Sequence, residues 1–178
     1  GSDSSMDSNW NGSLRLRVGI TIYPAHDRAI ERVLADLMQR CPAQFVLVTD
    51  VSGLIISTQG DRGGVELVGL ASLVAADLAA SQEIARLTGQ YQSYQLILRE
   101  GSKTNTFISE AGHYLVLFTQ VGTEVPLGWA RFLIREASCR LEEIISTPPD
   151  QMGSLDLGLG EKQLSDVVGD ALDAMWTD

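Results

Sequence analysis

Residues 65–87 read VELVGLASLVAADLAASQEIARL, and this pattern predicts a long helix without an ordinary solvent-exposed face. If each residue turns by about 100°, one broad side of the helix is lined by apolar residues that include all of its central leucines and valines except Leu73 and Val68. The residues on this side are Leu67, Leu70, Ala71, Val74, Leu78 and Ala85. The opposite side carries the small residues Gly69, Ser72, Ala76, Ala79 and Ala80. A helix that is apolar or small all round is normally buried on both sides. We therefore expect the larger side to pack on the protein's own sheet and the small side to receive a partner.

Composition narrows the class of protein. The chain has 178 residues and is 44% hydrophobic, which is enough for one core. Its net charge of −10 argues against a nucleic-acid groove or an anionic membrane surface. We expect a cytoplasmic protein without membrane insertion, in which Cys41 and Cys139 are small buried residues with free thiols.

The remaining periodicity predicts further elements around the 65–87 helix. Alternating apolar residues predict a strand over 14–22, and Asp27 is a plausible N-cap for a helix that Pro42 stops. Further strands are expected at 45–48, 54–56, 94–99, 104–109 and 114–119, and a third helix from Pro126. The predicted fold is α/β of the α+β type: a five-stranded, mostly antiparallel sheet between helices, in the order α-β-β-α-β-β-β-α.

These elements divide the chain into four parts. Residues 1–26 form an N-terminal extension with one possible extra strand, 27–146 a globular domain, and 147–160 a Pro/Gly-rich linker. Residues 161–178 form an acidic amphipathic helix, whose apolar positions follow helical spacing. They are Leu164, Val167, Val168, Ala171, Leu172, Met175 and Trp176. This helix either docks on its own protein or on a partner, and Trp129 is expected in the core.

The search for an active site finds little. His26 and His113 are the two histidines, and neither has a Cys or acid at metal-ligand spacing, so both are expected to be solvated turn residues. The glycine-rich loop 60–64 lacks the Gly-Lys-Ser/Thr ending of a P-loop and is interpreted as a connector. We therefore expect no enzyme active site, no metal and no cofactor.

The order and spacing of four stretches resemble the Roadblock (dynein light-chain type) family, in its bacterial MglB-like branch. They are FVLVTDVSGLIIS at 45–57, LASLVAADLAASQEIARLTG at 70–89, FISEAGHYLVLF at 107–118 and VPLGWARFLI at 125–134. The resemblance implies a homodimer in which the second helix and the following strand meet their symmetry mates. The dimer residues would be Gly69, Leu73, Asp77, Tyr94, Leu96 and Leu98.

The same resemblance implies a partner. MglB-like proteins bind a Ras-like small GTPase (MglA-like), two copies to one, and accelerate GTP hydrolysis without an arginine finger. By this likeness the GTPase would meet Ser72, Ala76, Ala79, Ala80 and Glu83, together with Leu164, Val168, Leu172 and Trp176 of the C-terminal helix. Glu83 departs from the small, uncharged pattern of related helices, and the process served, such as cell polarity, stays open.

Two other functions remain as alternatives. The protein could be a non-catalytic scaffold or a nucleotide-exchange promoter for a small GTPase, as other Roadblock proteins are. A small-molecule sensor is less favoured, because it needs a cavity lined by a few polar groups. Large strand residues such as Phe45, Phe107 and Leu117 are expected to fill the core instead.

Overall fold

The computed structural model describes residues 14–16, 19–91 and 94–155. The predicted C-terminal helix, with Leu164, Val168, Leu172 and Trp176, lies outside the described residues. The elements follow in the order β1 (Leu14–Arg15), β2 (Thr21–Ile22), α1 (Pro24–Arg40), β3 (Ala43–Asp50), β4 (Ile55–Gly60), α2 (Leu67–Leu87), β5 (Leu96–Glu100), β6 (Thr104–Ala111), β7 (Leu115–Gly122), α3 (Leu127–Ser146) and the 3-10 helix η2 (Pro149–Ser154).

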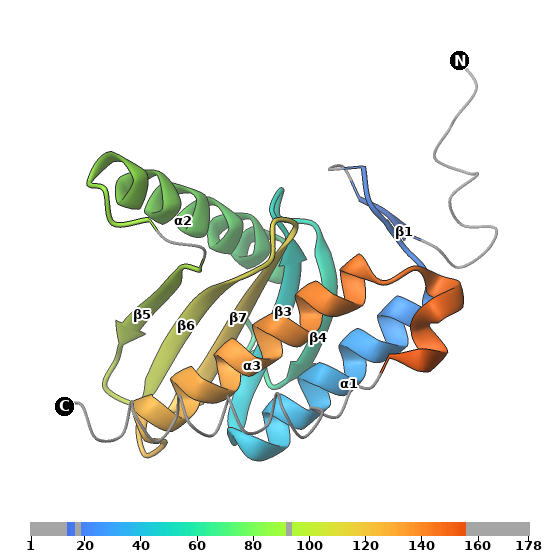
Figure 1. Cartoon of the computed structure of the whole chain (residues 1–178). Coiled ribbons are helices and arrows are strands. Elements are labelled where there is room, and N and C mark those ends of the chain that lie inside the picture. Colours follow the sequence, from blue (N-terminus) through green and yellow to red (C-terminus); the bar gives the residue numbers. More distant parts are fainter. Residues whose placement is uncertain (1–13, 17–18, 92–93, 156–178) are drawn as a thin grey trace.

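The main sheet has five antiparallel strands in the order β4-β3-β7-β6-β5, which confirms the predicted fold class. Helices α1 and α3 cover one face and α2 covers the other (Figure 1). Side-chain alternation explains the two cores, because successive residues of a strand point to opposite faces. Thus Val46 and Val48 pack toward α1 and α3, whereas Phe45 and Leu47 pack toward α2.

The N-terminal extension differs from its prediction. In place of one strand over 14–22 there are two short strands, β1 and β2, which pair with each other and not with the main sheet. The chain reverses at Gly19, whose φ of 91° lies in the region that favours glycine. Leu16 and Ile22 are buried against the α1–α3 core. The period-two pattern found the apolar residues but missed the turn between them.

Helix α1 begins at Pro24, before the predicted cap at Asp27. Pro24 suits the first helical turn, because the missing N–H would have no partner there. The backbone N–H of Tyr23 donates to Nδ1 of His26 at 3.1 Å, so Nε2 carries the proton and donates to the Thr147 carbonyl at 2.7 Å. The prediction of a solvated His26 is wrong: the ring is buried and joins the start of α1 to the end of α3.

Cys41, Cys139 and Trp129 differ in how far they are buried. Cys41 is buried as expected, and burial raises the pKa of its thiol to about 11. Cys139 is exposed on α3, so its predicted burial is wrong. Trp129 is likewise not a core residue, since 42% of it is exposed and its indole N–H donates to the Arg40 carbonyl at 3.1 Å. Both errors arise because apolar residues near the edge of a helical stripe can lie on either side of the burial boundary.

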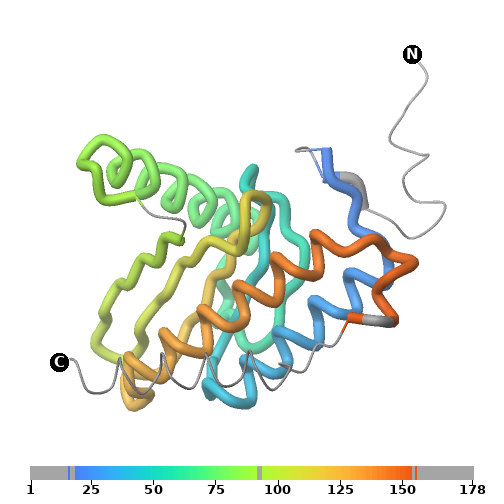
Figure 2. Tube along the Cα trace, in the orientation of Figure 1, coloured from blue at the N-terminus to red at the C-terminus, as the bar shows by residue number. Residues whose placement is uncertain are grey.

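Within the predicted linker 147–160, the first half folds back on the domain. Helix η2 lies beside α1, as the trace in Figure 2 shows. Met152 and Leu155 are partly buried against the α1–α3 core. The described chain therefore stays packed on the domain up to Leu155, on the same side of the sheet as α1 and α3.

Candidate partner-binding surface

The sheet-facing side of α2 packs as its periodicity predicts. Ala71, Val74 and Leu78 are buried against Phe45, Leu47 and Phe118 of the central strands. Among the described residues, α2 is the one helix long and apolar enough to cross a membrane, yet one side of it belongs to this core. Such a helix with a half-exposed apolar surface needs another cover.

The outward side of α2 is made of small side chains. Ser72, Ala76, Ala79 and Ala80 are all exposed, so the helix backbone lies close to the surface over about two and a half turns. Gly69 is half-buried, and a Cβ there would lie 2.5 Å from Oε2 of Glu66. That carboxylate caps the helix by accepting from the N–H groups of Val68 and Gly69 at 3.0 and 2.7 Å. The small size of Gly69 therefore serves the cap.

A row of large apolar residues flanks the small side. Leu73 is 69% exposed and Ile84 61%, while Leu87 at the end of the helix is 80% exposed. Asp77 lies between Leu73 and Ile84 along the helix. Both of its carboxylate oxygens accept hydrogen bonds from the Arg99 guanidinium of β5, and the distance from Nη2 to Oδ1 is 3.1 Å. This pair provides the partner that an acid in an apolar sector requires. It also shows that the Leu73–Ile84 flank faces the β5 edge of the sheet.

Strand β5 is the last strand of the sheet on this side and pairs only with β6 within the described residues. Leu96 and Leu98 are partly buried against the α1–α3 core, so their side chains are already engaged by the protein itself. Tyr94 is half-buried, with the Arg135 guanidinium 5.5 Å from its ring centroid, and burial raises its pKa. What β5 leaves available is its outer row of backbone N–H and C=O groups.

A buried carboxylate, which the sequence reasoning missed, fixes the loop between α2 and β5. Glu110 of β6 accepts from the Tyr91 hydroxyl at 2.8 Å and the Gln95 N–H at 3.0 Å, and it also bonds the Gln82 amide of α2. The bond to Glu110 raises the pKa of the Tyr91 hydroxyl. The available signal was an acid in the apolar stretch 107–111, FISEA, where the alternation offers it no exposed position.

The turn between β3 and β4 fixes the other end of the surface. Asp50 is fully buried, and its Oδ1 accepts from the Ser52 N–H, the Ser52 hydroxyl and the Leu54 N–H at 2.9, 2.7 and 2.9 Å. Gly53, with φ of 92°, lies so close to α2 that a Cβ would stand 3.0 Å from the Ser72 Cα. The turn therefore contacts the helix backbone beside Ser72 and holds the start of the small side in place.

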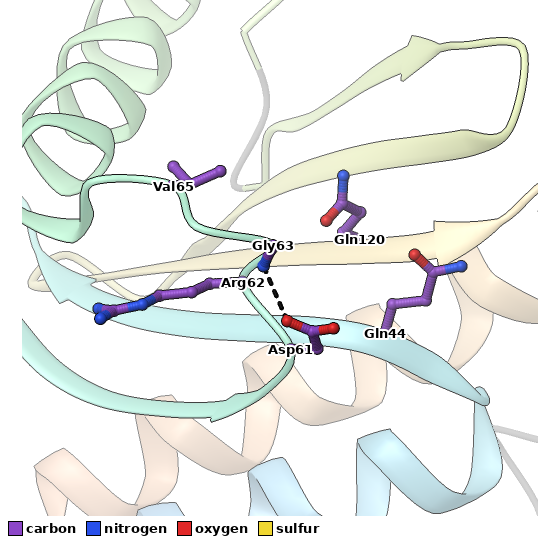
Figure 3. A pocket seen from close by; sticks show the side chains of 6 residues that line it. All are labelled: Gln44, Asp61, Arg62, Gly63, Val65 and Gln120. Atoms are coloured by element: carbon purple, nitrogen blue, oxygen red, sulfur yellow. Dashed lines mark hydrogen bonds between the residues drawn. The ribbon is translucent and has the colours of Figure 1, made fainter.

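The glycine-rich loop 60–64 borders a shallow, mostly exposed hollow and not an enclosed ligand-binding pocket. The hollow has a volume of about 490 Å³, and its lining is Gln44, Asp61, Arg62, Gly63, Val65 and Gln120. All of these except Gln120 are exposed, and the Arg62 side chain points away from the two glutamines (Figure 3). Asp61 accepts from the Gly63 N–H at 2.8 Å, which is ordinary turn chemistry. Within the described residues no group of His, Cys, Asp and Glu could hold a metal ion.

The predicted surface residues thus fall into groups. Ser72, Ala76, Ala79 and Ala80 form the small side, and Glu83 next to them pairs with Arg86 at 3.2 Å. Leu73 and Asp77 lie on the flank toward β5, while Gly69 belongs to the helix cap. All of these residues lie on helix α2, and the flank with Leu73 and Asp77 adjoins β5, the edge strand of the sheet. The GTPase and dimer roles assigned to them stay predictions.

Solved structures of known proteins share this architecture. Myxococcus xanthus MglB is 29% identical, with a TM-score of 0.62, and the match covers 68% of this chain and 91% of MglB. An MglB with a tetrameric arrangement is 26% identical, with a TM-score of 0.61 over 71% of this chain and 93% of that one. A Roadblock/LC7 domain from Streptomyces avermitilis, 18% identical, matches in fold with a TM-score of 0.58 over 65% of this chain and 97% of that domain. No protein-family model and no curated protein sequence matches.

Proposed function

Because the chain carries a Roadblock domain of the MglB-like type, we propose that it regulates a Ras-like small GTPase of the MglA type by binding it. The observation that carries this proposal is the outward side of α2, where exposed small residues adjoin exposed large apolar ones. Such a surface lets another protein's backbone approach closely and buries apolar area when it does. Its side chains are mostly small or apolar, which suits a regulator that acts on the active site of its partner.

The finer proposal is activation of GTP hydrolysis without an arginine finger. Residues 67–85 contain no Lys or Arg, so the small side of α2 has no cation to insert beside a phosphate. Arg86, at the end of the helix, is held by Glu83 and lies 4.8 Å from the Tyr91 ring centroid. Faster hydrolysis would then come from realigning the GTPase's own residues around the nucleotide and its Mg²⁺.

We further propose that the protein acts as a homodimer. Two copies related by a two-fold axis would pair their β5 edges and place their α2 flanks side by side. Pairing satisfies the outer backbone groups of β5, and the contact buries Leu73 and Ile84. The small sides of the two α2 helices would then form one shared platform for a single GTPase.

Self-association has a direct test in Leu73→Glu. We expect this variant to shift from dimer to monomer in analytical ultracentrifugation, with the dissociation constant raised at least about tenfold, because a charge would be buried at the contact. Val65→Glu is the matched control, since Val65 is also an exposed apolar residue but lies outside α2. A Leu73→Glu variant that dimerises as the wild type does would place the interface elsewhere.

The regulatory proposal is tested with an MglA-like GTPase loaded with GTP. We expect the full chain to form a complex and to accelerate phosphate release, while leaving the release of a fluorescent GDP analogue unchanged. Faster GDP release with unchanged hydrolysis would favour an exchange promoter, and binding without either effect would favour a scaffold. Absence of any complex would overturn the proposal of a GTPase regulator.

A further inference from the structure

We propose that residues 161–178 dock on the chain's own α1–α3 layer, running along α1 so that Trp176 meets Trp129 and Phe132. Two observations on the described residues support this proposal: an anchored, exposed aromatic pair, and the position of Leu155, from which residues 156–178 continue. The docking site lies on the opposite face of the sheet from the α2 surface.

The aromatic pair is fixed in an outward position. Trp129 is 42% exposed, and its indole N–H is held by the Arg40 carbonyl at 3.1 Å. The ring lies beside Phe132, with 5.9 Å between the ring centroids. Because its hydrogen bond is already satisfied inside the protein, the exposed indole surface gains most from an apolar contact. A rigid, partly exposed tryptophan of this kind is a typical anchor for a docking helix.

The tether favours this layer over α2. Leu155 is partly buried near the start of α1, and residues 156–160 can extend over at most about 17 Å. Packed layers lie about 10 Å apart, so the α1–α3 and α2 layers are about 20 Å apart across the sheet. A segment attached at Leu155 therefore reaches α1 and α3 directly, whereas the α2 surface of the same copy requires a path around the sheet.

Helix length places the two ends. A helix over residues 161–176 would be about 24 Å long, close to the length of α1 with its 17 residues. Helices α1 and α3 run antiparallel, since Thr147 contacts His26 at one end and Trp129 contacts Arg40 at the other. A segment that starts beside η2 and runs along α1 therefore ends at Arg40, where the aromatic pair lies.

The charges permit this arrangement. Helices α1 and α3 together carry six arginines and six carboxylates, so an acidic segment meets no net negative charge there. In a helix, Asp166, Asp170 and Asp173 would lie opposite the stripe that contains Leu172 and Trp176. The acids would remain in water while the apolar stripe covers the aromatic pair.

Cys139 provides a reporter for docking in the full chain. It lies two helical turns beyond Phe132 on the outward side of α3 and is exposed in the described structure, whereas Cys41 is buried. We expect Leu172→Glu combined with Trp176→Glu to raise the alkylation rate of Cys139 by iodoacetamide about tenfold. This is the rise expected if the wild-type segment is undocked about one tenth of the time and the variant segment is always undocked. Trp129→Ala should raise this rate to a similar extent.

The control adds the same charge to the other side of the segment, with Gln163→Glu and Thr177→Glu. This variant should alkylate Cys139 at the wild-type rate and melt at the wild-type temperature, because it leaves the docked side of the segment unchanged. Equal Cys139 rates in the wild type and the Leu172→Glu, Trp176→Glu chain would overturn docking on this layer. Protection that fades on dilution of the wild-type protein would overturn docking within one copy.

Discussion

A chain carrying Ala76→Arg is expected to bind its GTPase at least about a hundredfold more weakly, which corresponds to about 2.8 kcal/mol. Ala76 is exposed near the middle of the small side of α2. An arginine there would hold the two backbones apart, and its charge would be desolvated in the contact. In the proposed dimer the change occurs twice on one platform, which adds to the loss.

The measurement is titration of the GTP-loaded GTPase against the variant. Ala35→Arg is a matched control, because Ala35 is an exposed alanine within helix α1 on the other face of the sheet. Both variants should melt at the wild-type temperature, since neither position is in the core. If Ala76→Arg binds as tightly as Ala35→Arg, the GTPase does not use the small side of α2.

Replacing Glu110 with alanine is expected to lower the free energy of unfolding by about 3 kcal/mol. The substitution removes the acceptor for the Tyr91 hydroxyl, the Gln95 N–H and the Gln82 amide, all in a part-buried setting. Donors that lose their partner away from water retain the full desolvation penalty. The loop from α2 to β5 should loosen with them and carry the β5 edge along.

Urea unfolding measures this loss, and amide hydrogen exchange locates it. Glu110→Gln keeps one carbonyl acceptor and should cost less than Glu110→Ala, whereas Glu100→Ala, at an exposed position of β5, should cost almost nothing. Increased exchange should be concentrated in residues 88–91 and 94–96. A Glu110→Ala chain as stable as Glu100→Ala would contradict the structural role of this carboxylate.

Local periodicity was sufficient for the elements of the main sheet and for the two sides of α2. It failed where the hydrogen-bond partner of a residue lies far away in the sequence. The role of His26 depends on the carbonyl of Thr147, 121 residues away, and Trp129 is held by Arg40, 89 residues away. Spacing within a single helix cannot report such contacts, because it fixes which side a residue occupies but not what lies opposite.

The helical repeat of residues 65–87 is enough to give α2 one side for a core and one side of small residues. How that helix is held and which elements adjoin it depend on contacts with distant parts of the chain. Asp77 meets Arg99 of β5, Glu110 fixes the loop that follows, and Gly53 approaches Ser72. Each of these contacts joins α2, or the loop that follows it, to a strand or turn that the strand order of the sheet places beside it. That order results from packing two apolar faces of one sheet at once, a property of the whole chain that no single stretch contains.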